Sequence, residues 1–304
     1  MDPHLLRTFV TVAGLGSFSA AARELGYTQS AVSQHIAALE HDLGAPLLLR
    51  RPVVPTDAGT RLLEHAEPLL LRLDAARADI ARLLSAPAGR LTLGVTPLAM
   101  SSRLSRALAE VRCEQPGLEV AVRVTGHSAA VRGAAAGELD LALVDGMAAP
   151  SDPLYLPEAG PLVATGVAEE PSAVALPAGH PLAGRDGVRL VDLGDARWID
   201  APGTAAGLDR LRTLCGYDGF PVSLRYEGTD VRGLIALVAA GHGLALLPRS
   251  ALEGACGVVG TAVTEPRTVH RIEALHGGTG IGPAALLAAR LASVPGGAAD
   301  AVRA

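Results

Sequence analysis

The chain has 304 residues, of which 49% are hydrophobic and 19% are charged, and its formal net charge is −5. This length corresponds to two or three domains, and this apolar content is ample for packed cores, which excludes extensive disorder. The slightly acidic balance argues against a cationic protein that binds polyanions indiscriminately. All 26 basic residues are Arg, which excludes a phosphate-binding loop ending in Gly-Lys and a Schiff-base lysine.

Three widely spaced cysteines predict neither a disulfide framework nor a Cys-x-x-Cys site; they are Cys113, Cys215 and Cys256. We expect buried structural thiols, because free cysteine is usually buried; the alternative, a redox sensor, would lack a nearby resolving cysteine. The N-terminal residues have no signal-peptide pattern, and no apolar run approaches membrane-spanning length. The sequence therefore predicts a cytoplasmic protein without a membrane partner.

The N-terminal residues predict three short helices. The first carries one apolar stripe and is expected to end at residues 14–16; the stripe is Leu5, Leu6, Phe9, Val12 and Ala13. Ser17 can cap the second helix, Gly26 can end it, and Thr28 can cap the third. Two capped helices joined by a tight turn are the layout of a helix-turn-helix, whose second helix enters the DNA major groove.

The third predicted helix has one apolar side and one polar side. Val32, Ile36 and Leu39 point inward at i, i+4 and i+7. The other side and the N-terminal end then carry Gln29, Ser30, Ser33 and Gln34. A recognition helix presents such positions to base edges, and Gln can make two hydrogen bonds to adenine. The alternative is a merely solvated surface helix, which the capped pair of helices disfavours.

Two short extended pieces with Pro between them follow at residues 46–56 and predict a wing beside the helices. Arg50 and Arg51 would lie on this wing and contact phosphate. Between residues 1 and 55, however, four Arg are balanced by four acidic residues. Because phosphate neutralisation dominates DNA affinity, we expect one copy to bind weakly and with a shallow salt dependence.

A larger set of N-terminal residues keeps the order and nearly the spacing of a known signature: Phe9, Ser17, Phe18, Ala21, Ala22, Leu25, Gln29, Ala31, Val32, Ser33, Ile36, Leu39, Glu40, Leu43, Gly44, Leu47, Arg50 and residues 56–59. In these residues the chain resembles the LysR-type transcriptional regulators. The resemblance implies that Gln29, Ser33 and their neighbours read DNA, and that Arg50 and Thr56 hold its backbone. The chain departs from the family pattern in a shorter wing without a Gly-Arg tip, and in Ser30, where many relatives have Pro.

Residues 56–83 predict one long helix that starts at Thr56. Its apolar residues alternate at spacings of four and three, the pattern of a heptad seam: Leu62, Ala66, Leu69, Leu73, Ala76, Ile80 and Leu83. Charged flanks favour self-association of this seam over packing on its own domain. LysR relatives dimerise through such a helix, so the resemblance implies a homodimer or homotetramer. Pro68 predicts a kink near Glu64, and residues 85–89 read as a hinge.

From residue 90 onward, strand and helix patterns alternate, which predicts a mainly parallel α/β sheet. The expected strands are 91–96, 118–125, 139–144, 172–176, 197–200, 222–226, 244–247 and 270–275, and the expected helices are 101–112, 128–136, one after 203, 230–240 and 283–291. The runs at 137–144 and 239–248 resemble the effector-binding region of the same family. That resemblance implies two lobes, as in periplasmic binding proteins, with the ligand between them and the C-terminus returning to the first lobe.

The expected organisation is therefore α/β overall, in three parts. A winged helix-turn-helix DNA-binding domain would occupy residues 1–58. A linker helix for dimerisation, with the hinge, would occupy 59–89. The effector-binding domain would occupy 90–304, with lobe 1 at about 90–160 and 268–304 and lobe 2 at about 161–267.

Open α/β sheets bind ligands beyond the C-terminal ends of their strands. The loops at those ends give the candidate effector-binding residues: Thr96, Leu98, Ser101, Gly126, His127, Ser128, Pro202, Gly203, Thr204 and Thr229. The resemblance places Leu98 where relatives often have a hydroxyl, so a simple carboxylate would fit less well. His127 would make binding pH-sensitive. For each residue the alternative is a loop cap with no ligand role.

The favoured function is a sequence-specific regulator of transcription. Its partners would be double-stranded promoter DNA and a small-molecule effector, with RNA polymerase as a further candidate, and its DNA contacts would include Ser17 and Thr28. An enzyme is disfavoured, because G-x-S-x-G, H-x-x-x-H and G-x-G-x-x-G after a strand are missing and the Gly-rich run at 277–282 has the wrong spacing. No catalytic residue, cofactor or metal site is predicted. A solute-binding protein is opposed by the N-terminal module.

Overall fold

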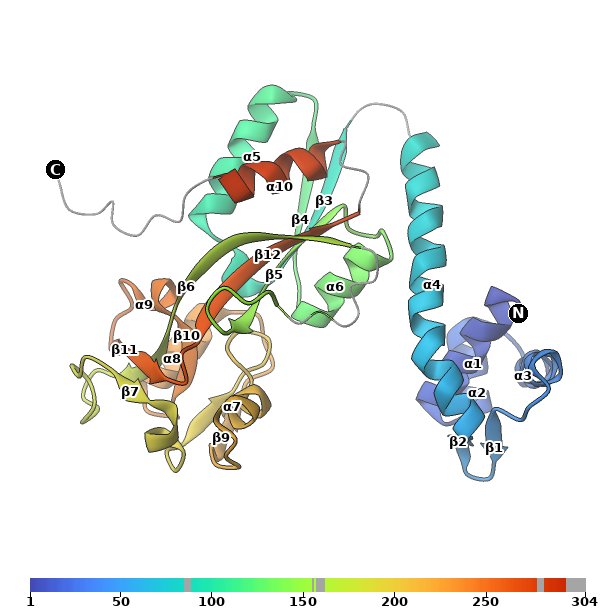
Figure 1. Ribbon diagram of the computed structural model, residues 1–304, viewed down its shortest axis with the longest axis horizontal. Helices are drawn as coiled ribbons and strands as arrows, with labels where there is room; N and C mark the ends of the chain where they lie inside the picture. The colour runs from blue at the N-terminus through green and yellow to red at the C-terminus, as the bar shows by residue number, and fades with distance from the viewer. Residues whose placement is uncertain (85–88, 155, 157–161, 278–281, 294–304) are drawn as a thin grey trace. The chain divides into compact units, whose positions relative to one another are not determined.

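The computed structural model describes residues 1–84, 89–154, 156, 162–277 and 282–293, with the backbone alone at 78, 79 and 81–84. The chain divides into two compact units, Met1–Leu84 and Ser85–Ala304 (Figure 1). Among the residues described, no helix is long and apolar enough to cross a membrane.

The N-terminal unit is a bundle of helices with a two-stranded antiparallel hairpin. Its elements are α1 (Pro3–Leu15), α2 (Phe18–Leu25), α3 (Gln29–Leu43), β1 (Leu48–Arg50), β2 (Val53–Pro55) and α4 (Asp57–Leu84). The predicted caps are confirmed: the hydroxyls of Ser17 and Thr28 accept the N–H groups of Ala20 and Ala31, each at 3.2 Å. Gly26 ends α2 with φ of 70°, a conformation that glycine adopts without steric cost. The first helix ends at Leu15 with Gly16 as its C-cap, within the expected residues 14–16.

One hydrophobic core holds this unit together. Phe9, Ile36 and Leu39 are fully buried in it, beside Ala21 of α2 and Leu47 before the hairpin. The inward stripe predicted for the third helix is therefore confirmed. Small alanines on α2 allow the helices to cross closely, because they add little side-chain volume at the contact.

The C-terminal unit contains a mixed sheet of eight strands and a separate pair. The strands are β3 (Arg90–Val95), β4 (Glu119–Val124), β5 (Leu141–Ala148), β6 (Val163–Pro177), β7 (Val188–Arg189), β8 (Trp198–Asp200), β9 (Val222–Arg225), β10 (Ala245–Pro248), β11 (Val258–Glu265) and β12 (Val269–His276). The helices are η1 (Pro97–Ala99), α5 (Ser102–Glu114), α6 (His127–Ala135), η2 (Leu190–Leu193), α7 (Leu208–Cys215), α8 (Val231–Ala239), α9 (Arg249–Leu252) and α10 (Pro283–Ser293).

The prediction of a mainly parallel sheet is wrong. The order is β4-β3-β5-β12-β6-β11-β7, with β10 also paired to β6. Pairing is parallel through β4, β3 and β5, but β12 is antiparallel to both β5 and β6, and β10 and β11 are antiparallel to β6. The reason is that β6 and β12 run as a long antiparallel pair between the two ends of the unit, rather than as further β-α-β repeats.

Strand β6 runs through the whole sheet and pairs with strands at both ends of the unit. Its first part, residues 163–171, pairs with β12, and its last part, residues 172–177, pairs with β10 and β11. Val167 belongs to the core beneath α5 and α10, whereas Ala173 and Val174 belong to the cores at the other end. The register with β12 shifts between Ile272 and Glu273, so the pair contains an irregularity near Val167.

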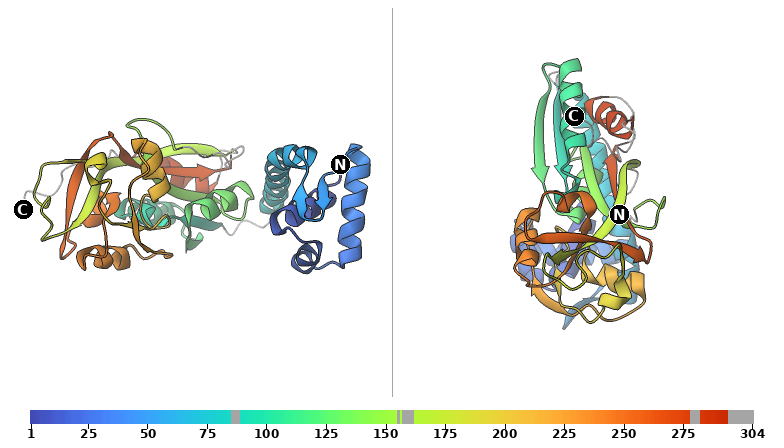
Figure 2. Two further views of the ribbon diagram at one scale, coloured as in Figure 1. Left: turned by 90° about the horizontal axis from the view of Figure 1, so that it is seen from below. Right: turned by 90° about the vertical axis from the view of Figure 1, so that its left-hand side faces the viewer.

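Helices cover both faces of the sheet at the β3 end (Figures 1 and 2). Residues of α5 and α10, including Leu104 and Leu291, pack into one core with β3 and β5. Residues of α6, including Val131, pack into another core that contains Leu275 of β12. At the β6 C-terminal end, α8 and α7 each contribute to a core, through Leu234 and Leu211 respectively.

Candidate DNA interface and ligand pocket

The polar edge of α3 is exposed, while its apolar edge is in the core. Gln29, Ser30 and Gln34 are exposed and Ser33 is partly exposed, whereas Val32 is fully buried. The four polar residues therefore lie on the surface, on the first turns of a capped helix. Side chains of this kind on the N-terminal turns of a helix are suited to reading base edges in a major groove.

The hydroxyls of Ser17 and Thr28 stand at the N-termini of α2 and α3. Each accepts a helix N–H through its oxygen, so its own hydrogen stays free to donate to an acceptor such as phosphate. Helix N-termini also favour anions, because their first N–H groups have no partner within the helix. Both residues are therefore suited to hold a DNA backbone.

The wing is present as β1 and β2. Arg51 is exposed. The Arg50 guanidinium lies 4.9 Å from the centre of the Phe18 ring and 3.7 Å from Glu40, which fixes its direction while leaving the side chain about half exposed. Thr56 is different: its hydroxyl donates to the Pro46 carbonyl oxygen at 2.7 Å and accepts from Gly59, so it has no hydrogen left for a phosphate.

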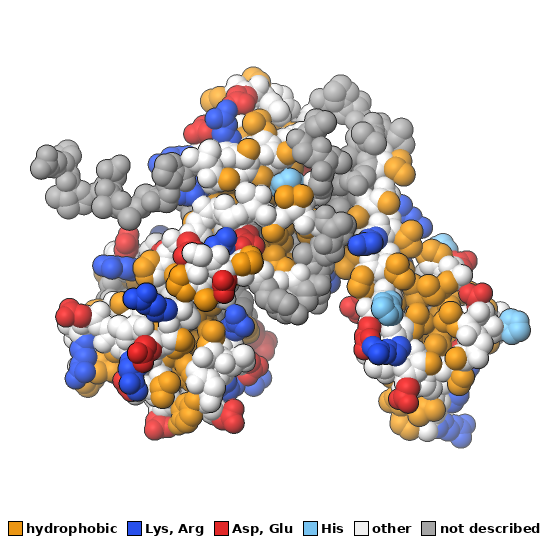
Figure 3. Space-filling view, viewed as in Figure 1, with side chains coloured by type: hydrophobic (Ala, Val, Ile, Leu, Met, Phe, Trp, Pro, Cys, Tyr) orange, Lys and Arg blue, Asp and Glu red, His pale blue; other side chains and the backbone are white. Residues whose placement is uncertain are grey.

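The apolar residues of helix α4 form two sets, one packed on its own unit and one exposed, although the heptad pattern predicted a single seam. Ala66 is fully buried and Leu62 is half-buried, both against the core of their own unit, together with Leu70. Leu69, Leu73 and Ile80 are 41, 38 and 58% exposed, and apolar side chains are visible along this helix in Figure 3. The expectation of a single self-association seam is thus wrong for its first two members, because α1 occupies that side of the helix.

Two further expectations concern the same helix. It continues without interruption through Pro68, so the kink near Glu64 stays a prediction. The side chain of Leu83, a predicted seam member, lies outside the described residues, as do residues 85–88 of the predicted hinge.

The C-terminal unit contains a pocket of about 390 Å³. Six of the ten predicted effector residues line it: Thr96, Leu98, His127, Pro202, Gly203 and Thr204. Its other lining residues are Asp145, Gly146, Met147, Leu154, Ser172, Ala205, Ala206, Gly207, Arg210, Leu246, Leu247, Pro248 and His270. The volume is near the lower end of the range for small-molecule sites, roughly 300–1,000 Å³.

Four predicted effector residues do not line this pocket. Ser101 instead caps α5, accepting from the Leu104 N–H at 3.5 Å, and Gly126 is the N-cap residue of α6. Ser128 and Thr229 are exposed on the surface. Ser101 and Gly126 stand at helix starts and Ser128 and Thr229 face solvent, so only part of each predicted loop reaches this pocket.

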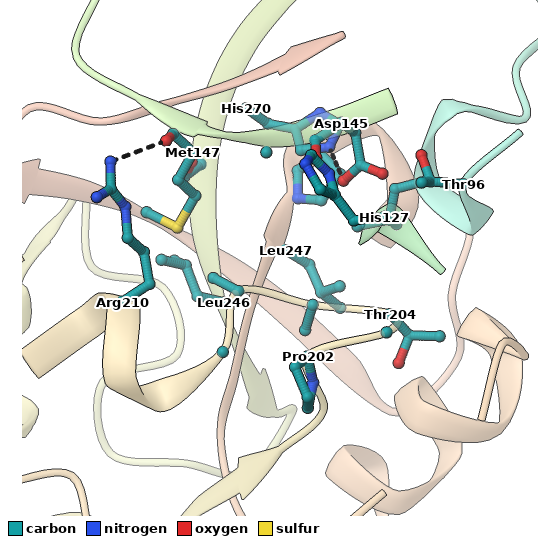
Figure 4. Close-up of a pocket in the computed structure, with 18 of the residues that line it drawn as sticks. Thr96, His127, Asp145, Met147, Pro202, Thr204, Arg210, Leu246, Leu247 and His270 are labelled. Carbon is teal, nitrogen blue, oxygen red and sulfur yellow. Dashed lines mark hydrogen bonds and ion pairs between the residues drawn. The ribbon is translucent and has the colours of Figure 1, made fainter. Parts of the chain in front are cut away.

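One end of the pocket is built from acidic and imidazole groups (Figure 4). The His270 Nε2–H donates to Asp145 Oδ2 at 2.8 Å, and His270 is only 4% exposed. The His127 Nδ1–H donates to the Asp145 carbonyl oxygen at 2.9 Å, because that oxygen can only accept. In neutral His127 the Nε2 atom is then an acceptor. Strand β5, strand β12 and the start of α6 bring these three residues together.

The carboxyl group of Asp145 is held in its ionised form. Burial, the largest influence, would raise its pKa, but hydrogen bonds from His270 and Thr96 and the charges of both histidines together lower the pKa below the ordinary value of 3.8. Asp145 is therefore a fixed negative charge beside the pocket at neutral pH.

This pKa shift predicts how stability depends on pH. A carboxylate whose pKa is lower when folded stabilises the fold above its unfolded pKa, here about 3.8, and loses that effect as the pH falls through the folded value. We expect Asp145→Asn to reduce the free energy of unfolding at pH 7, and expect the difference from the wild type to shrink below about pH 4. Urea unfolding across this range measures it; a difference that grew on acidification would contradict the assignment.

Two hydroxyls in the pocket have no partner. Ser172 and Thr204 are 2 and 1% exposed, and neither hydroxyl oxygen has a hydrogen-bond partner among the described residues. An unpaired buried hydroxyl costs free energy that a ligand can recover. Across the pocket in Figure 4, Arg210 on the first turn of α7 donates to the Met147 carbonyl oxygen at 3.4 Å.

The rule that ligands bind beyond strand ends does not predict four further lining residues: Asp145, Ser172, Arg210 and His270. Ser172 and His270 lie inside strands β6 and β12, and Arg210 lies inside a helix. A signal did exist for Asp145: an acidic side chain interrupts the otherwise apolar strand β5, and such a group is rarely buried without a partner.

The cysteines differ from expectation. Cys113 and Cys256 are exposed and Cys215 is partly buried, all as free thiols. The prediction of three buried thiols is therefore wrong for two of them. Cys215 lies against the core of α7, and burial raises its pKa, so it is not an activated thiolate.

A capped helix-turn-helix with a wing, followed by a mixed α/β unit with a polar pocket, defines a DNA-binding regulator controlled by a ligand. Residues 3–60 match the bacterial regulatory helix-turn-helix protein of the lysR family, and residues 85–275 match the LysR substrate binding domain. The chain belongs to the LysR family of transcriptional regulators, which join a helix-turn-helix DNA-binding domain to an effector-binding domain and are not enzymes.

Individual relatives agree with this assignment. The chain is 34% identical to the HTH-type transcriptional regulator BudR of Raoultella terrigena, over 82% of this chain and 85% of that protein. It is 36% identical to the small neutral protease regulatory protein of Streptomyces coelicolor, over 78% and 70% respectively. Among solved structures it is similar to a cysteine mutant of OxyR from Corynebacterium glutamicum, with a TM-score of 0.51, 25% identity and coverage of 96% and 91%.

Proposed function

We propose that α3 reads the operator in the major groove through Gln29, Ser30, Ser33 and Gln34. Ser17, Thr28, Arg50 and Arg51 would hold the flanking phosphates. The observation that carries this proposal is the division of α3 into a buried apolar edge and an exposed polar edge at a capped N-terminus. Thr56 is left out, because its hydroxyl is bonded within the protein.

The DNA-binding unit has little charge with which to neutralise phosphate. Four Arg and four acidic residues balance over residues 1–55, so a single copy gains little from counterion release. We infer that operator binding depends on two or more linked copies, each reading one half-site. The slope of log affinity against log salt should then be shallow per subunit.

We propose that the exposed side of α4 joins two copies. Leu69, Leu73 and Ile80 are spaced four and seven residues apart, as in a heptad seam. In the described part of their own unit, no side chain covers them. A second α4 offers a matching apolar surface, which would give a homodimer; whether dimers pair further into tetramers depends on the C-terminal unit.

Leu73→Glu tests this interface. Dimerisation would bury the side chain in both copies, and each Leu contributes about 1.5–3 kcal/mol when fully buried. We therefore expect the dimer dissociation constant to rise roughly 100-fold or more. Sedimentation velocity over a concentration series measures this. Arg72→Glu is the control, because it introduces glutamate at a neighbouring exposed position, and it should leave the dimer intact. Equal effects of the two variants on the dissociation constant would show that α4 is not the interface.

We propose that the effector occupies the pocket lined by Thr96, His127 and Thr204 and acts by shifting a conformational equilibrium. A ligand that contacts residues from both ends of the C-terminal unit stabilises the arrangement in which both contacts are made. It thereby biases the geometry of the linked DNA-binding units. The proposal includes two lobes, residues 90–160 with 268–304 and residues 161–267. Action in the cytoplasm and contact with RNA polymerase at the promoter belong to the same proposal.

The decisive experiment is DNase I footprinting of the full-length protein on the intergenic DNA beside its own gene. We expect protection of a site with two similar half-sites spaced by whole helical turns. Protection that competitor random duplex removes as readily as unlabelled site would contradict sequence-specific binding.

A further inference from the structure

We infer that the pocket takes a small zwitterion of the α-amino-acid class with an apolar side group, its ammonium at Asp145 and its carboxylate at Arg210. This inference rests on the proposed function of the pocket and names the chemistry of its ligand. It follows from the unequal distribution of charged and polar groups around the pocket wall.

The Asp145 end is rich in acceptors. Asp145 keeps lone pairs beyond those that His270 and Thr96 engage, and it lines the pocket. In the neutral form of His127, the Nδ1–H donates to a backbone carbonyl and Nε2 is a second acceptor. An ammonium group supplies three donors to such a surface, whereas a ligand carboxylate would meet a like charge.

The opposite end offers donors. Arg210 is held only by one long hydrogen bond to the Met147 carbonyl oxygen, and among the described residues no carboxylate lies within ion-pair distance of it. The Thr204 hydroxyl, unpartnered within the described residues, does not belong to this end, because Figure 4 places Thr204 on the other side of the pocket from Arg210. The Gly207 start of α7 has no side-chain cap. A carboxylate fits a guanidinium and the free N–H groups at a helix start together.

Between the two ends the pocket wall is apolar. Leu246 and Leu247 lie between Asp145 and Arg210 in Figure 4, and Leu98 and Met147 line the same space. An apolar side group would cover this wall, and the Ser172 hydroxyl, which has no partner among the described residues, also lines the pocket.

The two charged ends belong to different cores. Asp145 extends from β5, whose Leu143 packs beneath α5, whereas Arg210 follows Leu208 in the core of α7. A ligand with one charge alone can engage only one of them. A zwitterion engages both, which gives the ligand the differential contacts that a conformational shift requires.

The test is calorimetric titration of the full-length protein with three matched probes: L-leucine, isoamylamine, which lacks the carboxylate, and isocaproate, which lacks the ammonium. A wider panel of alanine, valine, methionine and phenylalanine accompanies them. We expect at least one amino acid to bind, and each truncated probe to bind its parent site roughly tenfold or more weakly than leucine.

Two variants locate the charges. Asp145→Asn should weaken leucine and isoamylamine but not isocaproate, and Arg210→Gln should weaken leucine and isocaproate but not isoamylamine. Arg185→Gln, an exposed arginine outside the pocket, is the matched control. Isocaproate binding at least as tightly as leucine, or no panel member binding at millimolar concentration, would overturn the inference. The same preparations are footprinted on DNA: specific protection without amino-acid binding refutes this inference alone, whereas loss of protection refutes the proposed function.

Discussion

Replacing both Gln29 and Ser33 with alanine should abolish most of the preference of this regulator for its operator over random duplex. A bidentate side-chain contact to a base is worth about 1–3 kcal/mol of discrimination, so losing the Gln29 contact alone lowers the specificity ratio roughly 5- to 150-fold. In a dimer the loss occurs at both half-sites. Competition anisotropy against specific and random duplexes measures the ratio directly.

The fold should not change in this variant. Gln29 is exposed and Ser33 partly exposed, and neither supplies the cap of α3, which is Thr28. We therefore expect an unchanged melting temperature and unchanged non-specific affinity. His41→Ala, an exposed change near the other end of the same helix, is the matched control and should keep full specificity. An unaltered ratio in the double variant would show that α3 does not read the bases.

Gly59→Ala should destabilise the N-terminal unit by about 1–3 kcal/mol or more. A Cβ at residue 59 would lie 2.1 Å from the Leu47 carbonyl oxygen and 3.3 Å from Pro55 Cβ. The first contact is with backbone that cannot rotate away, so α4 or the segment before the wing must shift. Because Leu47 is buried in the core, the shift is transmitted to the packing of α3.

A second glycine provides the contrast. Gly14 lies inside α1, is exposed, and has nothing within 4 Å of its ideal Cβ position. Gly14→Ala should therefore stabilise the unit by roughly 0.5–1 kcal/mol, the usual gain in a helix interior. Urea unfolding followed by circular dichroism measures both variants. Equal stability of the two would contradict the steric role of Gly59.

The N-terminal unit was largely predictable because its signals are local. The caps at Ser17 and Thr28 and the glycine at residue 26 act within one helical turn of themselves, and the inward stripe of α3 repeats every turn. What local pattern could not reveal is which neighbour takes each side of α4. Ala66 and Leu69 look alike as seam residues, yet only the packing of α1 decides that one is buried and the other exposed.

In the C-terminal unit, long-range pairing limited prediction. Only residues 172–176 of β6 read as a strand, since Glu169, Glu170 and Pro171 interrupt the apolar run, yet the strand extends over Val163–Pro177. Pairing with β12 keeps those residues extended. The pocket shows the same limit on prediction. The sequence pattern predicts the loops after β3 and β8, but Asp145 and His270 meet only because β5 and β12 are neighbours in the sheet.

The unbroken course of β6 through both ends of the C-terminal unit sets how this regulator can move. Two bodies joined by loose segments could swing widely, but here one strand, paired along its length apart from the irregularity near Val167, is common to both ends, and Glu170 also accepts a hydrogen bond from the Ser250 N–H at 2.9 Å. Any closure around a ligand must then flex that strand elastically. We expect such a response to be small in amplitude and stiff, a slight change of curvature within this unit rather than a large rearrangement.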